Sequence, residues 1–151
     1  MKAIFDAAAL AYAKMNRHEG TYAVRADTYS FHGTVDGGTG EWAERYDKAR
    51  QIAAQEGKIV YLLVTAPGCR WCKRFIRTTL KDKAVRKRLA ALAVGVEVER
   101  DSGTYPAKFK APMIPIHYFL SADEWILVKM LGYWNIEDFM SIVDEVERKR
   151  K

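Results

Sequence analysis

The chain has 151 residues, of which 49% are hydrophobic and 29% are charged. This balance is typical of a globular protein and excludes a disordered or fibrous chain, and the length suits one domain with a single core. Every hydrophobic run falls short of the roughly 20 residues that a bilayer-spanning helix needs, so we expect no transmembrane segment. The formal net charge is +6.

The pattern predicts an N-terminal extension over residues 1–40, made of a helix and a glycine-containing loop. The chain starts with one lysine and many alanines, but Asp6 interrupts the apolar run that an export signal requires. We therefore identify no export signal in this sequence. A leader absent from this chain would leave the same pattern.

A helix and a buried strand open the predicted domain, which spans residues 41–151. Aromatic and small residues recur at helical spacing from Glu41 to Glu56, and Gly57 follows as a C-terminal cap. Residues 58–65 form a continuous apolar, β-branched run, which is typical of a strand buried on both faces. This strand belongs in the middle of a sheet.

A second helix and a second strand follow. After Gly68, apolar residues recur at helical spacing as far as Leu80. Residues 94–98 then alternate valines with glycine and glutamate, which predicts a strand. We expect Glu97 and Glu99 on this strand to face solvent.

A hairpin and a closing helix complete the predicted domain. Residues 114–120 and 125–131 are apolar runs joined by a four-residue polar connection, which predicts an antiparallel pair. Asn135 is placed to cap a final helix with an apolar stripe that reaches Val146. The order of elements predicts an α/β fold with a mixed, four-stranded sheet flanked by helices.

The chain's two cysteines, Cys69 and Cys72, are three positions apart where the buried strand gives way to a helix. A thiolate is the attacking species in disulfide exchange, and the helix start at Cys69 favours negative charge through its unpaired N–H groups and dipole. Cys72 lies on the apolar stripe, where desolvation disfavours a thiolate. We therefore assign Cys69 as the nucleophile and Cys72 as the resolving thiol of thiol–disulfide exchange.

Basic residues gather beside the cysteines. Nine basic residues and one acidic residue lie between Arg70 and Arg88, whereas the rest of the chain holds 16 basic and 18 acidic residues. We predict that Arg70, Lys73 and Arg74 lower the pKa of Cys69 and so favour the reduced form of the pair. The positive electrostatic field of these residues would also attract an acidic redox partner. We expect no nucleic-acid partner, because the run has no recognition motif or series of stacking aromatics.

Three stretches of the chain carry a family signature: VYLLVTAPGCRWCKRF, APMIPIHYFL and LGYWNIEDF. They resemble the thioredoxin superfamily over about residues 41–148. The CxWC form is similar to that of exported bacterial thiol–disulfide reductases and interchange proteins. The resemblance implies a thioredoxin fold and an enzyme, a thiol–disulfide oxidoreductase of cell redox homeostasis. It implies protein thiols or disulfides as partners and no cofactor beyond the redox-active Cys69–Cys72 disulfide.

The resemblance also implies further site residues. It places a cis Pro115 against the cysteines and the backbone of Ile114 against an extended substrate peptide, and Trp71 is placed to contact apolar substrate surface. Two departures disfavour a general cytosolic thioredoxin: Leu63 stands where thioredoxins proper have a buried aspartate, and Arg70 and Trp71 replace their Gly-Pro.

Other interpretations of the cysteines stay open. Buried free cysteines are common in cores, and a CxxC pair is half of a zinc site, although no second CxxC or paired histidines follow. We expect His117 to be a hydrogen-bonded strand residue rather than a ligand or a catalytic base. The alternative function is a non-catalytic binding module on the same fold, whose basic face at 70–88 binds an acidic partner.

The resemblance favours a reductase or an interchange protein, and we expect a monomer. It also favours a periplasmic or otherwise extracytoplasmic location, with a leader absent from this chain. If the chain is complete, the expected location is cytoplasmic, which would favour a reducing role.

Overall fold

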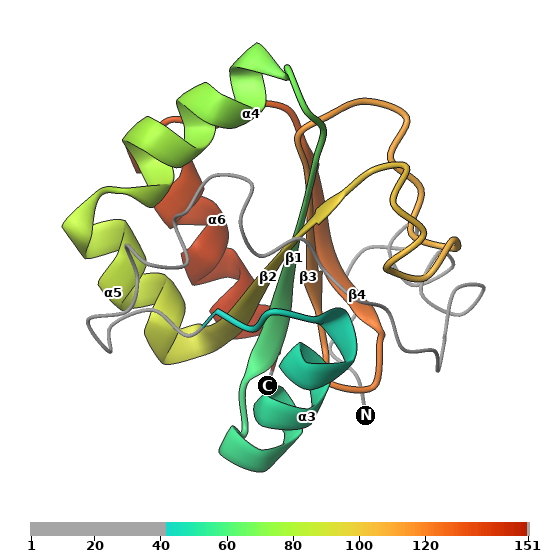
Figure 1. Ribbon diagram of the computed structural model, residues 1–151. Helices are drawn as coiled ribbons and strands as arrows, with labels where there is room; N and C mark the ends of the chain where they lie inside the picture. Colours follow the sequence, from blue (N-terminus) through green and yellow to red (C-terminus); the bar gives the residue numbers. More distant parts are fainter. Residues whose placement is uncertain (1–41, 151) are drawn as a thin grey trace.

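A computed structural model describes residues 42–150, and the predicted extension over 1–40 lies outside these residues. The described chain forms a four-stranded sheet in the order β2-β1-β3-β4 with helices against both faces (Figure 1). β1 pairs parallel with β2 and antiparallel with β3, and β3 pairs antiparallel with β4. The predicted α/β fold with a mixed, four-stranded sheet is confirmed.

The elements follow the predicted order with two differences. The helix expected from Glu41 starts at Tyr46, because Trp42 instead forms a β-bridge with Gly95. The sequence pattern also missed a helix after Leu80, which Asp82 caps by accepting a hydrogen bond from the main-chain N–H of Val85 at 3.0 Å. The elements are α3 (Tyr46–Glu56), β1 (Ile59–Thr65), α4 (Arg70–Phe75), the π-helix η1 (Ile76–Leu80), α5 (Lys83–Leu92), β2 (Ala93–Glu99), β3 (Ile116–Leu120), β4 (Ile126–Leu131) and α6 (Ile136–Lys149).

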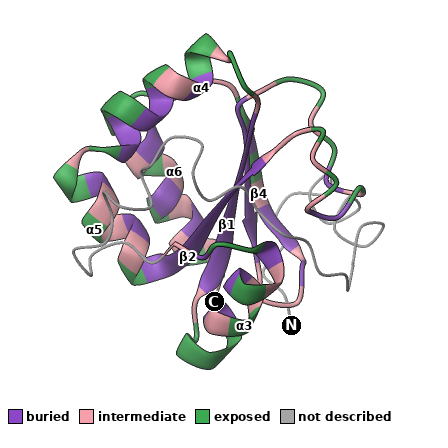
Figure 2. Cartoon of the chain, viewed as in Figure 1, coloured by how far each residue is buried: buried purple, intermediate pink, exposed green. Residues whose placement is uncertain are grey.

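Strand β1 is buried along its whole length, as its apolar run predicted. Tyr61 and Leu63 face α4, η1, α5 and α6, whereas Val60, Leu62 and Val64 pack with the residues of α3 on the other side. Figure 2 shows this buried sheet between helices whose outer surfaces are exposed. Because both faces are covered, an apolar residue at every position of β1 is stabilising.

The expectation that both glutamates of β2 face solvent is wrong for Glu97. Its side chain is fully buried and accepts a hydrogen bond from the hydroxyl of Thr65 at 3.0 Å, whereas Glu99 is partly exposed. The alternation of valine with glycine and glutamate along β2 therefore does not indicate a solvent-exposed face. On the same strand, the ring of Trp42 lies so close to Gly95 that a Cβ there would be 2.7 Å from it.

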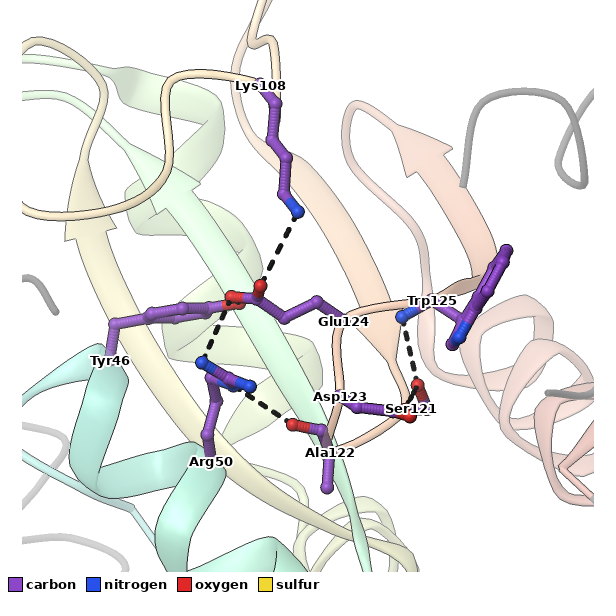
Figure 3. A network of polar contacts seen from close by, with 8 residues as sticks. All are labelled: Tyr46, Arg50, Lys108, Ser121, Ala122, Asp123, Glu124 and Trp125. Carbon is purple, nitrogen blue, oxygen red and sulfur yellow. Dashed lines mark hydrogen bonds and ion pairs between the residues drawn. The ribbon is translucent and has the colours of Figure 1, made fainter. Parts of the chain in front are cut away.

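The connection between β3 and β4 buries the carboxylate of Glu124 (Figure 3). The hydroxyl of Tyr46 donates to it at 2.6 Å, and Arg50 and Lys108 lie 3.7 Å and 3.4 Å from its oxygens. Burial raises the pKa of Glu124, and the hydrogen bond from Tyr46 and the two cations act against that rise. We call Tyr46, Arg50, Lys108 and Glu124 the hairpin cluster; it ties α3 and the 100–115 loop to the hairpin.

The hairpin cluster and the cysteines lie at opposite ends of the sheet. In the antiparallel register of β1 and β3, Val64 pairs with Ile116 and Val60 pairs with Leu120. The cysteines follow the carboxyl end of β1, and the hairpin follows the far end of β3 (Figure 1). The length of the strands therefore separates the charges of the hairpin cluster from the cysteines.

Candidate functional site: the disulfide at the end of β1

Cys69 and Cys72 form a disulfide at the start of α4, with their Cα atoms 5.3 Å apart. Gly68 makes the turn from β1 with a positive φ of 79°, which glycine adopts without strain. Cys69 is the N-cap of α4, and its sulfur accepts a hydrogen bond from the Cys72 N–H at 3.1 Å. Cys69 is partly exposed and Cys72 is fully buried, so Cys69 is the cysteine of the pair that borders solvent. The interpretation as two free cysteines is therefore wrong.

Four basic residues lie along α4 and η1, the helical segment that starts at the disulfide. Arg70, Lys73, Arg74 and Arg77 line an open hollow of about 540 Å³ together with Gly68 and Thr78. We call this the basic hollow. It places the three residues predicted to tune Cys69, Arg70, Lys73 and Arg74, on one surface that starts at the cysteines.

An aromatic pair holds the guanidinium of Arg74. This guanidinium lies 5.6 Å from the ring centre of Trp71 and 5.5 Å from that of Tyr133, and the two rings are 5.9 Å apart. The Tyr133 hydroxyl is also 3.3 Å from that of Thr78, an interaction that lowers the pKa of Tyr133. Trp71 remains 51% exposed, as a substrate-contacting side chain must be. No local pattern in the sequence predicts the contact between Tyr133 and Trp71, because 61 residues separate them.

The segment before β3 carries the predicted proline. The peptide bond between Ile114 and Pro115 is cis. The Pro115 carbonyl accepts a hydrogen bond from the Gly132 N–H at 2.7 Å, so this oxygen is occupied, while Ile114 precedes the strand ladder and is half-buried. Met113, which the sequence did not single out, is 45% exposed beside them and adds an apolar side chain to this segment.

His117 belongs to a buried hydrogen-bonded chain on β3, which confirms its predicted structural role. Its Nε2 lies 2.8 Å from the carbonyl of Gly132, and its Nδ1 lies 2.7 Å from the hydroxyl of Tyr61. A carbonyl only accepts, so Nε2 carries the proton and the Tyr61 hydroxyl donates to Nδ1. Burial lowers the pKa of His117 to about 4 and raises that of Tyr61. The imidazole is therefore neutral at pH 7.

No group of three or more histidine, cysteine or acidic residues in the described range 42–150 is arranged to hold a metal ion. The cysteines thus have no further ligands near them in this range to complete a zinc site. Within the same residues, none of the helices is both long enough and apolar enough to cross a bilayer.

The sheet order, the helix that starts at the CxxC disulfide and the closing hairpin and helix define a thioredoxin fold. Solved structures agree. A thioredoxin from Thermus thermophilus superposes with a TM-score of 0.61 at 22% identity, covering 72% of this chain and 87% of that one. The DsbH oxidoreductase gives 0.60 at 20% identity, covering 74% and 87% of the two chains.

A third similar structure is the reduced C-terminal domain of Neisseria meningitidis DsbD, with a TM-score of 0.53 at 18% identity, covering 68% of this chain and 92% of that domain. No family model matches the chain, and no curated protein matches it. At these identities the similarity establishes the fold, and the function has to be argued from the site.

Proposed function

We propose that the chain is a thiol–disulfide oxidoreductase that acts on protein disulfides as a reductase or interchange protein. The observation that carries this proposal is the Cys69–Cys72 disulfide itself, with one sulfur partly exposed at the start of a helix and the other fully buried. An exposed attacking sulfur and a sheltered second sulfur suit a two-step exchange.

In the reducing direction, the Cys69 thiolate attacks one sulfur of a substrate disulfide, and the other substrate sulfur leaves as a thiolate. The Cys72 thiolate then attacks the Cys69 sulfur and releases the second substrate thiol. Two electrons pass to the substrate, and the Cys69–Cys72 bond forms. The Cys72 N–H, 3.1 Å from the Cys69 sulfur, supports this assignment because a hydrogen bond to the charged form lowers a pKa.

The surroundings support roles for the other predicted residues. Arg70 and Lys73 raise the positive potential at Cys69, whereas the Arg74 guanidinium is shared with the rings of Trp71 and Tyr133. We further propose that the exposed Trp71 and the segment at Ile114 and Pro115 receive the substrate peptide. The protein would act as a monomer, in an extracytoplasmic compartment.

The first test is the equilibrium reduction potential of the cysteine pair, followed by tryptophan fluorescence in a series of glutathione buffers. We expect a reversible two-electron transition at a potential above the value of about −270 mV that is typical of thioredoxin. A value towards about −120 mV would instead identify an oxidant or an isomerase. Absence of any transition would overturn the proposal and favour the binding module.

A trapping experiment tests the order of attack. Cys72→Ser should accumulate a mixed disulfide with a substrate protein, because the second step is blocked, whereas Cys69→Ser should accumulate none. If Cys69→Ser accumulates the mixed disulfide instead, the roles of the two cysteines are reversed.

A further inference from the structure

The basic hollow beside the disulfide has features that disulfide exchange alone does not require. Four of its six lining residues are cationic and none is acidic. Its volume of about 540 Å³ lies within the range of about 300–1,000 Å³ that is usual for ligand sites. It therefore has room for several side chains rather than for a single ion.

In the part of the chain that the structure describes, no carboxylate pairs with the cations of the basic hollow. Within residues 42–150, none of Arg70, Lys73, Arg74 and Arg77 forms an ion pair. Elsewhere in the same basic run, Arg88 does pair, with Asp144 at 3.0 Å and with Glu147. Among the described residues, the ion pairs of the run thus lie at its end away from the disulfide.

Asp82, the one acidic residue between Arg70 and Arg88, serves as a helix cap. Asp82 directs its carboxylate to the N–H of Val85 at 3.0 Å, as the N-cap of α5. A carboxylate held at a helix start is stabilised by that helix and does not reach across to the previous one. The positive potential at the hollow is therefore retained.

Resting on the proposed function, we propose that the basic hollow binds an acidic segment of the substrate protein next to the cysteine that Cys69 attacks. Arginine forks bind carboxylates in two-point contacts. Arg70 and Arg77 are seven positions apart, or about 10 Å along a helix at 1.5 Å per residue. An extended chain covers that length in about three residues. The preferred substrate thus carries a run of about three acidic residues beside its target cysteine.

The test uses cysteine peptides joined by a disulfide to the neutral thiol 2-mercaptoethanol. Matched peptides carry three glutamates or three glutamines next to the cysteine, placed before it in one pair and after it in another. The reduced protein transfers two electrons and releases both thiols, and the rate of peptide release is measured. We expect an acidic peptide to react about tenfold faster than its neutral match, and the preference to decline with added salt.

Two variants with the same loss of charge separate the hollow from the overall field. Arg77→Gln lies in the hollow and should lower the acidic-to-neutral rate ratio about threefold. Lys87→Gln lies in the same basic run on the exposed surface of α5, outside the hollow, and should leave the ratio unchanged.

The outcomes distinguish this proposal from the function on which it rests. Equal rates for acidic and neutral peptides would overturn binding in the hollow and leave the exchange function standing. Equal effects of the two variants would also overturn it, because overall charge would then explain the preference. Failure to reduce any of the peptides would overturn the exchange function and this proposal together.

Discussion

The two ends of the sheet use positive charge in opposite ways. At the hairpin cluster, Arg50 and Lys108 surround the buried carboxylate of Glu124, and each cation has a partner. At the basic hollow, cations from Arg70 to Arg77 stand together with no acid among them. The difference shows that the cations that join elements at the hairpin share a buried carboxylate, whereas the cations along α4 and η1 have no acid partner in the described part of the chain.

The largest effect should come from removing the carboxylate at the hairpin. Glu124→Ala leaves Tyr46, Arg50 and Lys108 without their shared acceptor, and we expect a loss of about 3–5 kcal/mol in the free energy of unfolding, measured in urea. Glu124→Gly makes the same deletion but tolerates the φ of 77°, so its loss should be smaller by about 1 kcal/mol. A loss below about 1 kcal/mol for the alanine variant would mean that the cluster does not hold the hairpin.

Lowering the pH should destabilise the protein, because His117 is buried and neutral in the folded state. The folded-state pKa of His117 is lowered from 6.5 to about 4, so the unfolded chain takes up a proton first as the pH falls. The stabilisation is complete above about pH 6.5 and is lost progressively down to about pH 4, a change of about 3 kcal/mol. His117→Gln should flatten this part of the pH profile. Parallel profiles for the two proteins would exclude His117 as the cause.

A smaller effect is expected at Arg74, the one cation of the hollow that is held by rings. Arg74→Ala removes contacts to Trp71 and Tyr133 and should cost about 1 kcal/mol of unfolding free energy. Arg74→Lys keeps the charge but loses the planar group, and it should recover part of this loss. Full recovery by lysine would attribute the effect to charge and not to stacking.

The smallest effect on stability should follow the loss of Arg70, the cation inside the CxxC motif. Because Arg70 is exposed and has no acid partner in the described part of the chain, Arg70→Ala should change the unfolding free energy by less than about 0.5 kcal/mol. In the reduced protein it should nevertheless raise the pKa of Cys69, measured by thiolate absorbance. An unchanged thiol titration would remove Arg70 as a tuning residue.

Much of the fold could be predicted because its signals are local. The apolar run of β1, the stripe of α6 and the polar connection between β3 and β4 each lie within a short stretch, and hydrophobic periodicity reports such stretches directly. The position of the CxxC pair at the start of a helix could be predicted for the same reason, since Cys69 is followed at once by α4 and by basic residues. The role of Cys69 as the nucleophile stays a prediction.

The features that local sequence patterns did not predict depend on contacts between residues far apart in the chain. Glu97 was assigned to a solvated face, but its burial depends on the packing around β2, which an alternating pattern does not reveal. Glu124 lies in the polar connection that the pattern predicted, but its buried partner Tyr46 is 78 positions away. The contact between Tyr133 and Trp71 likewise arises only when the β4–α6 connection reaches the start of α4.

The close contact between Trp42 and Gly95 has a consequence for how the protein behaves in a concentrated solution. β2 is an edge strand, and an edge presents main-chain groups to which a strand of another molecule can add. Here the Ala43 N–H already occupies the carbonyl of Gly95 at 2.9 Å, next to the β-bridge of Trp42 with Gly95, and the indole lies over the face of the strand at Gly95. A side chain at 95 would displace the indole and disturb this bridge, so the glycine helps keep part of the edge closed to a strand of another molecule.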